Sequence, residues 1–341
     1  MKKIILTLII ATTFATTGGC TQDSTSFSRE YIQAIRNGAK AKVTLSVTDE
    51  HGKPMTNAAA TVYFDMISKR GNVIKGLTDT NGLFSAEALC ADYASIGVRK
   101  DGYYDARFKY GNVRSSDPER LKDGCWQPWD PTIPVVLREI RNPIPMYVKL
   151  FEGTFGNGDT VGFDCEKGDF IEPHGEGKVA DFMIRVDGSG LKYENMTKEI
   201  SLDSLDPDGG FMILDWYQYS TFKSEYLAPE SGYITNLTAS SSHDNTKRVE
   251  EVMLYKGGDV TRLDSGGEYV IFKSRIKRDA DGNVISANYG KIYRAFEFMG
   301  REQTKEAWVR FLYYFNPTPN DRNLEFDGKN SLLLEGARFI P

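Results

Sequence analysis

Histidine, cysteine and net basic charge are all scarce in this chain of 341 residues. Its three histidines, His51, His174 and His243, lie far apart, and none has a second histidine or a cysteine at zinc-ligand spacing. Its 42 basic residues are outnumbered by 47 acidic ones, and a net charge of -5 supplies no field that would attract a phosphate backbone. We therefore expect no metal, no cofactor and no nucleic-acid partner.

The sequence also lacks the Gly-x-Ser-x-Gly turn of serine hydrolases and the Gly-x-x-x-x-Gly-Lys loop that binds phosphates. What it contains is typical of a turn-rich β protein: 32 glycines, 18 tyrosines and 19 phenylalanines. A chain of this length has room for about two domains. We expect an all-β fold made of two β-sandwich domains.

The first residues have the pattern of a secretory signal, with charged Lys2 and Lys3 before the apolar run 4–10, which is too short to span a bilayer. The motif Thr17-Gly18-Gly19-Cys20 that follows resembles the lipobox of bacterial lipoproteins. This resemblance implies cleavage before Cys20 and a lipid on that cysteine. Leu is usual where Thr17 stands, so an ordinary secretory signal, with Cys20 as a bystander, is the alternative.

The resemblance predicts a signal peptide over residues 1–19 and a polar tether over 20–39 that joins the lipid to the first folded unit. Thr21, rather than an aspartate, follows the cysteine, which favours the outer membrane, with the leaflet left open. If Cys20 carries a lipid, three cysteines remain that can form disulfides in an oxidising compartment: Cys90, Cys125 and Cys165. We predict a Cys90–Cys125 disulfide, the alternative being three isolated buried cysteines.

Residues 40–139 form the first predicted domain, because apolar Val43, Leu45 and Val47 alternate with polar residues and about six further short strands follow. A series of turn and strand motifs is carried by Asp49, Gly52, Lys53, Pro54, Ala58, Ala60, Thr78, Asp79, Gly82, Phe84, Lys100, Gly102 and Tyr103. In this order they resemble the carboxypeptidase regulatory-like domain, a transthyretin-like β-sandwich. That family consists of accessory modules, so the resemblance implies scaffolding or adhesion and no catalysis.

Residues 140–145 contain two prolines and are predicted to be a linker. Beyond it, residues 146–341 show short alternating apolar runs separated by turn clusters. This pattern predicts a second, larger antiparallel β-sandwich of about ten strands.

Carboxylates gather at three places in this second domain. The segments 206–209 and 279–282 both read Asp-x-Asp-Gly but lack the glycine and glutamate of an EF-hand, so we interpret them as turns, with a non-EF calcium site as the alternative. The loop 164–176 holds Asp164, Glu166, Asp169 and Glu172 near Cys165 and His174. A solvated loop is our interpretation there, and a carboxylate-dependent hydrolase is the alternative.

Aromatic residues are the remaining candidates for function. Trp216, Tyr217, Tyr219 and Tyr226, with the polar Asp215 and Gln218, are the predicted ligand-binding residues, because flat rings stack on sugars while carboxylates and amides bind hydroxyl groups. The alternative is that these rings pack a core. Trp126 and Trp129, in an insertion within the first domain, are a second candidate pair, with loop packing as the alternative.

These observations favour a non-enzymatic lipoprotein of the bacterial cell envelope that acts in surface binding or assembly. Its expected partners are the membrane, through Cys20, and either polysaccharide or envelope proteins. Glycan capture is the leading function, and a structural, adhesive or secretion-accessory role is the alternative.

Overall fold

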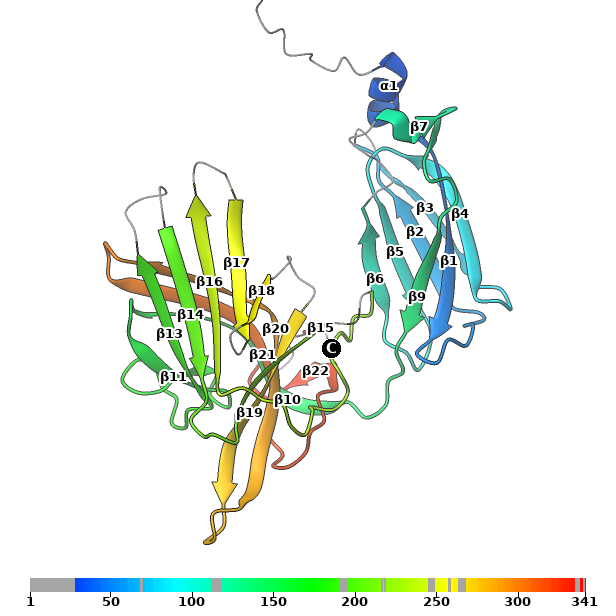
Figure 1. The fold of residues 1–341 in the computed structure, drawn as a ribbon. Coiled ribbons are helices and arrows are strands. Elements are labelled where there is room, and N and C mark those ends of the chain that lie inside the picture. Colours follow the sequence, from blue (N-terminus) through cyan, green and yellow to red (C-terminus); the bar gives the residue numbers. More distant parts are fainter. Residues whose placement is uncertain are drawn as a thin grey trace, which may run out of the picture.

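The computed structural model describes residues 28–67, 70–111, 118–189, 196–215, 217, 219–244, 249–256, 259–262, 268–334, 338–339 and 341. The predicted signal peptide, Cys20, Trp216 and Gln218 lie outside the described residues. The chain forms two β-sandwiches with a short helix at the far end of the first (Figure 1). Within the described residues, no helix is both long and apolar enough to span a bilayer.

The helix α1 (Arg29–Asn37) closes one end of the first sandwich. It begins because the hydroxyl of Ser28 caps it by accepting a hydrogen bond from the Tyr31 N–H, and it ends at Gly38, where φ is 80°. Tyr31 is buried and lies edge-on to Trp126, with ring centroids 6.1 Å apart. This contact attaches the helix to the sandwich.

The first sandwich contains two sheets. The larger has the strand order β4-β1-β8-β7, with β9 also paired to β1. Its strands are β1 (Ala39–Asp49), β4 (Leu83–Cys90), β7 (Leu121–Lys122), β8 (Cys125–Trp126) and β9 (Thr132–Leu137), with a 3-10 turn at Pro118–Arg120. The smaller sheet has the order β3-β2-β5-β6, from β2 (Ala59–Phe64), β3 (Asn72–Leu77), β5 (Ala94–Arg99) and β6 (Ala106–Tyr110).

The strand alternation predicted for residues 43–47 is confirmed, because Val43, Leu45 and Val47 are all buried in β1. The turn after it forms as the motif indicates, since Asp49 accepts hydrogen bonds from the N–H groups of His51 and Lys53. The described residues give nine strands rather than about seven. The parallel pairing of β9 with β1 was not predicted.

The predicted Cys90–Cys125 disulfide is wrong, because all three cysteines in the described residues are free thiols. Cys90 lies opposite Ala39 and Cys125 lies opposite Lys40, on the two strands that flank β1. Strands separated by a third strand lie about 10 Å apart, beyond the roughly 7 Å Cα separation that a disulfide can bridge.

The second sandwich also contains two sheets. The six-stranded sheet has the order β15-β19-β20-β21-β10-β22 and consists of β10 (Ile144–Gly156), β15 (Gly210–Asp215), β19 (Glu268–Arg278), β20 (Val284–Arg301), β21 (Glu306–Asn316) and β22 (Phe326–Ser331). The seven-stranded sheet has the order β12-β11-β13-β14-β16-β17-β18. Its strands are β11 (Thr160–Asp164), β12 (Asp169–Phe170), β13 (Phe182–Ser189), β14 (Met196–Asp203), β16 (Asn236–Asp244), β17 (Val249–Lys256) and β18 (Asp259–Arg262).

Phenylalanines from both sheets fill the core of the second sandwich. The ring of Phe163, on β11, lies 5.0 Å from that of Phe311, on β21, and 4.7 Å from that of Phe151, on β10. Such edge-to-face pairs join the two layers. Thirteen strands form in the described part of this domain, against about ten predicted, and β10 pairs in parallel with β22 in an otherwise antiparallel sandwich.

Candidate functional site on the outer face of the first sandwich

The predicted aromatic segment lies on the connection between β15 and β16, which reaches across to the first sandwich. The Tyr219 carbonyl accepts a hydrogen bond from the Arg107 N–H at 2.8 Å, and the Thr221 N–H donates to the Asp105 carbonyl at 2.8 Å. The Tyr219 ring lies 3.9 Å from that of Phe108. Tyr219 therefore extends the edge of strand β6 instead of presenting a free ring.

Two other predicted residues also contribute to contact between the sandwiches. The Tyr226 hydroxyl donates to the Glu139 carbonyl at 2.6 Å and lies 3.0 Å from the Glu50 carboxylate. The Tyr217 ring covers the guanidinium of Arg138. Asp215 is exposed at the end of β15. The structure thus places these tyrosines at an interdomain contact, and it brings Tyr219 beside a groove that the sequence did not indicate.

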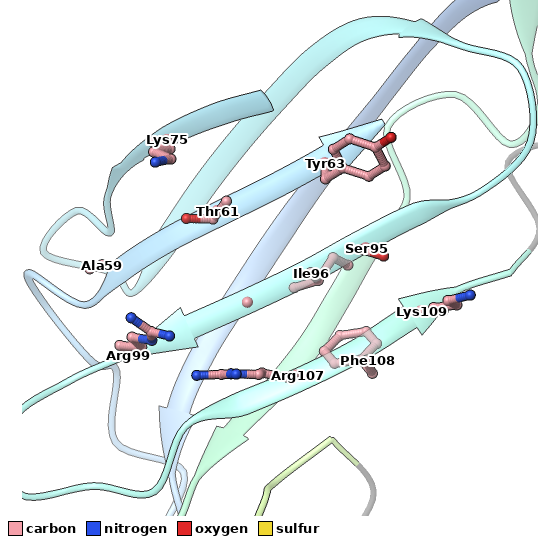
Figure 2. Close-up of a pocket in the computed structure, with 11 residues that line it drawn as sticks. Ala59, Thr61, Tyr63, Lys75, Ser95, Ile96, Arg99, Arg107, Phe108 and Lys109 are labelled. Carbon is pink, nitrogen blue, oxygen red and sulfur yellow. The ribbon is translucent and has the colours of Figure 1, made fainter. Parts of the chain in front are cut away.

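The groove lies on the outer face of the four-stranded sheet and has a volume of about 640 Å³ (Figure 2). Its floor is formed by β2 and β5, where four of the six outward residues are small, namely Ala59, Thr61, Ser95 and Gly97, and the other two are Tyr63 and Arg99. A Cβ added at Gly97 would meet no atom within 4 Å, so the missing side chain leaves open space on the floor of the groove.

Long side chains from the edge strands flank this floor. Cross-strand pairing places Lys75, Thr61, Gly97 and Arg107 in one row across the sheet. The next row is Val73, Tyr63, Ser95 and Lys109. In the first row, long residues on β3 and β6 flank short ones on β2 and β5, so the register itself makes this part of the groove.

The groove is cationic although the whole chain is acidic. Of its eleven lining residues, four are basic, namely Lys75, Arg99, Arg107 and Lys109, and none is acidic. The Arg99 and Arg107 side chains are 65% and 57% exposed, and both bind the same Asp105 oxygen, at 2.9 and 2.7 Å. One carboxylate thus holds two guanidinium groups together at one end, with positive charge left over for a ligand (Figure 2).

The other end of the groove is aromatic. Tyr63 lies on β2 across from Ser95, and its hydroxyl donates to Asp65 at 3.1 Å, which raises the pKa of Tyr63. Lys109 stands in the same cross-strand row, with Ser95 between it and Tyr63, and its ammonium lies 4.4 Å from the centroid of the Tyr93 ring. The ring of Tyr63 is therefore held in place, and the site combines a flat face with cations about a polar floor.

The loop weighed as a hydrolase site has its buried carboxylates engaged in structural contacts. Asp164 accepts hydrogen bonds from the N–H groups of Lys178 and Val179, and Arg275 bonds both Asp164 and Asp181, at 3.0 and 2.9 Å. Burial opposes the charged form of Asp164, but these backbone N–H groups and the Arg275 charge outweigh it and lower its pKa.

The Cys165 and His174 pair is not brought together, because Cys165 is fully buried, with its pKa raised by that burial, whereas His174 is exposed.

The two Asp-x-Asp-Gly segments are turns: Arg278 pairs with Asp206, and Asp279 accepts the Asn283 N–H. Within the described ranges, no group of three or more His, Cys, Asp or Glu side chains could hold a metal ion.

The two tryptophans of the first-domain insertion differ. Trp126 is buried, and its indole N–H donates to the Cys90 carbonyl at 2.8 Å, so it is a core residue. Trp129 is 38% exposed.

No protein-family model matches the chain, and no curated protein matches it. Among solved structures it is similar to the 3-chlorocatechol 1,2-dioxygenase of Rhodococcus opacus 1CP, with 11% identity and a TM-score of 0.24 over 30% of this chain and 61% of that one. It is also similar to BcpA, the major pilin subunit of Bacillus cereus, with 12% identity and a TM-score of 0.22 over 89% and 100% of the two chains.

A third similar structure is the shaft pilin spaA from Lactobacillus rhamnosus GG, with 11% identity and a TM-score of 0.19 over 74% of this chain and 92% of that one. The chain spans 61% of the chlorocatechol dioxygenase and 57% of a hydroxyquinol 1,2-dioxygenase from Pseudomonas putida DLL-E4. At these identities and TM-scores, the similarities carry no information on function.

The groove residues escaped the sequence analysis because no single strand carries more than two of the four basic residues, and β2 carries none. The available signal was the alternation in residues 94–99 and 106–110, where buried positions interleave with serine, glycine, arginine and lysine. Basic and small residues share one face only once the register of four strands is known.

Proposed function

We propose that this protein is a non-enzymatic lipoprotein of the cell envelope that captures acidic glycans in the groove of the first sandwich. The observation that carries the proposal is the row Lys75, Thr61, Gly97 and Arg107, in which two cations flank a floor without bulky side chains. A sugar carboxylate or sulfate suits the planar guanidinium groups of Arg99 and Arg107, which bind such anions with two parallel hydrogen bonds.

The rest of the groove has the chemistry that a sugar ring requires. The Tyr63 ring supplies a flat apolar face, and the hydroxyl groups of Thr61 and Ser95 supply both donors and acceptors for sugar hydroxyls. A volume of about 640 Å³ is within the range of roughly 300–1,000 Å³ that is typical of small-molecule sites. The groove therefore has room for a short stretch of oligosaccharide.

The anchor belongs to the same proposal. A lipid on Cys20 would hold the first sandwich close to the membrane, joined to it by the polar residues that precede α1. In the native host, Cys20→Ala should move the protein from the membrane fraction to the soluble fraction. An unchanged membrane fraction would refute the anchor without affecting the groove.

The groove is tested by calorimetric titration of the mature protein with oligogalacturonate and heparin hexasaccharides, and with maltohexaose as the neutral comparison. We expect an acidic hexasaccharide to bind, and Arg99→Gln and Arg107→Gln each to weaken binding at least about tenfold, since each removes a charge-assisted hydrogen bond. Arg185→Gln is the matched control, because Arg185 is 47% exposed and pairs with Asp187 on the second sandwich.

Equal loss of binding in the Arg185 variant would show that only net charge matters, and binding that survives both groove variants would place the ligand elsewhere. If neither acidic probe binds the unaltered protein, the structural or adhesive role becomes the preferred function. The two sandwiches are firmly joined through Arg138, which suits that role as well.

A further inference from the structure

A second hollow, on the outer face of the six-stranded sheet, surrounds Trp308. It has a volume of about 380 Å³ and is lined by Thr154, Met299, Arg301, Glu306, Ala307 and Trp308. Trp308 stands in the middle strand of three, between Thr154 on β10 and Met299 on β20. The hairpin joining β20 to β21 projects away from the first sandwich, so this hollow is far from the first groove (Figure 1).

The indole ring of Trp308 is fixed in orientation. Its N–H donates to the Glu152 carboxylate at 3.0 Å, and Glu152 lies on β10 in the adjacent cross-strand row, opposite Arg310. Trp308 is only partly exposed and stands on the opposite side of its strand from the buried Ala307 and Val309. A tethered ring on the solvent side of a sheet gives up little conformational freedom when a ligand stacks on it.

Polar groups stand on the other side of the ring from Glu152. Gly156, Glu306 and Arg301 form the next cross-strand row, and a Cβ on Gly156 would lie 2.1 Å from an Asp159 carboxylate oxygen. The Asp159 carboxylate thus occupies the space left by the missing side chain, in line with Glu306 and Arg301. Two carboxylates and one guanidinium therefore lie along one edge of a fixed indole.

We propose that the Trp308 hollow is a second carbohydrate site, which binds a pyranose ring of a neutral glycan. The axial C–H face of a sugar stacks on an indole, and carboxylates and a guanidinium bind neighbouring hydroxyl groups. Acidic sugars are disfavoured here because four carboxylates around the indole, those of Asp159, Glu306, Glu152 and Glu297, outnumber the guanidinium groups of Arg301 and Arg310. The charge preference is opposite to that of the groove in the first sandwich, so this site stands independently of the proposed function.

The test is calorimetric titration of the mature protein with neutral hexasaccharides of glucose, mannose, xylose and N-acetylglucosamine. We expect one of them to bind, Trp308→Ala to weaken binding at least about tenfold, and Trp308→Phe, which keeps a ring but loses the bond to Glu152, to weaken it less. Trp129→Ala is the control, since Trp129 is an exposed tryptophan on the first sandwich.

The groove variant Arg107→Gln should leave this neutral binding unchanged, and Trp308→Ala should leave acidic binding unchanged, which separates the two sites. If Trp308→Ala fails to fold, Glu306→Gln and Trp308→Phe still decide the question, because both change the hollow and not the core. The proposal is overturned if no neutral hexasaccharide binds, or if binding is the same with and without the indole.

Discussion

The guanidinium of Arg138 lies 3.7 Å from the centroid of the Tyr217 ring, across the boundary between the two sandwiches. Arg138 follows strand β9 of the first sandwich and is almost completely buried. It forms a 3.0 Å ion pair with Glu50 of its own domain and donates to the Phe222 carbonyl of the other at 3.2 Å. The rings of Phe222 and Tyr226 cover it as well. One cation thus joins both domains.

Removing this cation should uncouple the sandwiches. Arg138→Met leaves Glu50 with weaker partners and the Phe222 carbonyl without its donor, which we expect to cost about 3 kcal/mol of unfolding free energy. Scanning calorimetry should then show two separated transitions, one for each sandwich.

Arg141→Gln is the control for that experiment. Arg141 is 46% exposed and also pairs with Glu50, at 3.2 Å, so its loss should cost less than about 1 kcal/mol. Equal effects of the two substitutions would mean that burial of Arg138 does not determine the coupling.

Lys291 predicts an unusual dependence of stability on pH. It is buried on β20, with its ammonium hydrogen-bonded to the Ser224 hydroxyl at 2.9 Å, and burial, aided by the Arg138 charge, lowers its pKa to about 7. The unfolded lysine keeps its proton up to its ordinary pKa of 10.5. Between these values the unfolded chain binds more protons, so stability must rise with pH.

Urea denaturation at pH 7.0 and 8.5 measures this effect. The free energy of unfolding should increase by roughly 1 to 2 kcal/mol between the two values, and Lys291→Met should remove that increase. The window ends at pH 8.5 because the raised pKa values of Cys90 and Cys165 act in the opposite direction above it. If the free energy of unfolding of the unaltered protein does not increase between these pH values, Lys291 is charged and accessible in the folded protein.

Much of the architecture is encoded in local sequence patterns and could be predicted from them. The alternation of Val43, Leu45 and Val47 defines a half-buried strand without reference to any partner, and the Asp49 turn is stabilised by its own backbone. The all-β class and the two sandwiches follow from such signals. Strand number was underestimated where strands are only two residues long, as in β7, β8 and β12.

The functional surface was not predictable in the same way, because it depends on register between strands. Lys75 and Arg107 are 32 positions apart in sequence and share a row only because β3, β2, β5 and β6 pair in that order. The tyrosines at positions 217, 219 and 226 were predicted to bind a ligand, whereas the structure places them against the first sandwich. A single sequence does not reveal which surface a ring contacts.

The thiols provide a direct check on the corrected disulfide. In a Cys20→Ala protein without reductant, iodoacetamide should label Cys125 first, because Cys125 is partly exposed whereas Cys90 and Cys165 are buried. Burial also raises the pKa of Cys90 to about 11, which slows its reaction further. In urea, peptide mass mapping should find all three thiols labelled. Labelling of Cys165 alone in urea would restore the Cys90–Cys125 bridge.

Gly97 allows the groove to be filled without damage to the fold. Its neighbours Ile96 and Val98 face the core, so a side chain at Gly97 points outward, where an added Cβ meets nothing within 4 Å. Gly97→Val should therefore abolish binding of the acidic hexasaccharide while keeping or raising the melting temperature, since valine suits a strand better than glycine by up to about 1 kcal/mol. The matched substitution Gly76→Val, on strand β3, should lower the melting temperature and leave glycan binding by the folded protein intact, because a Cβ there lies 2.5 Å from the Phe84 ring. If Gly97→Val binds as well as the unaltered protein, the floor of this groove is not where the glycan lies.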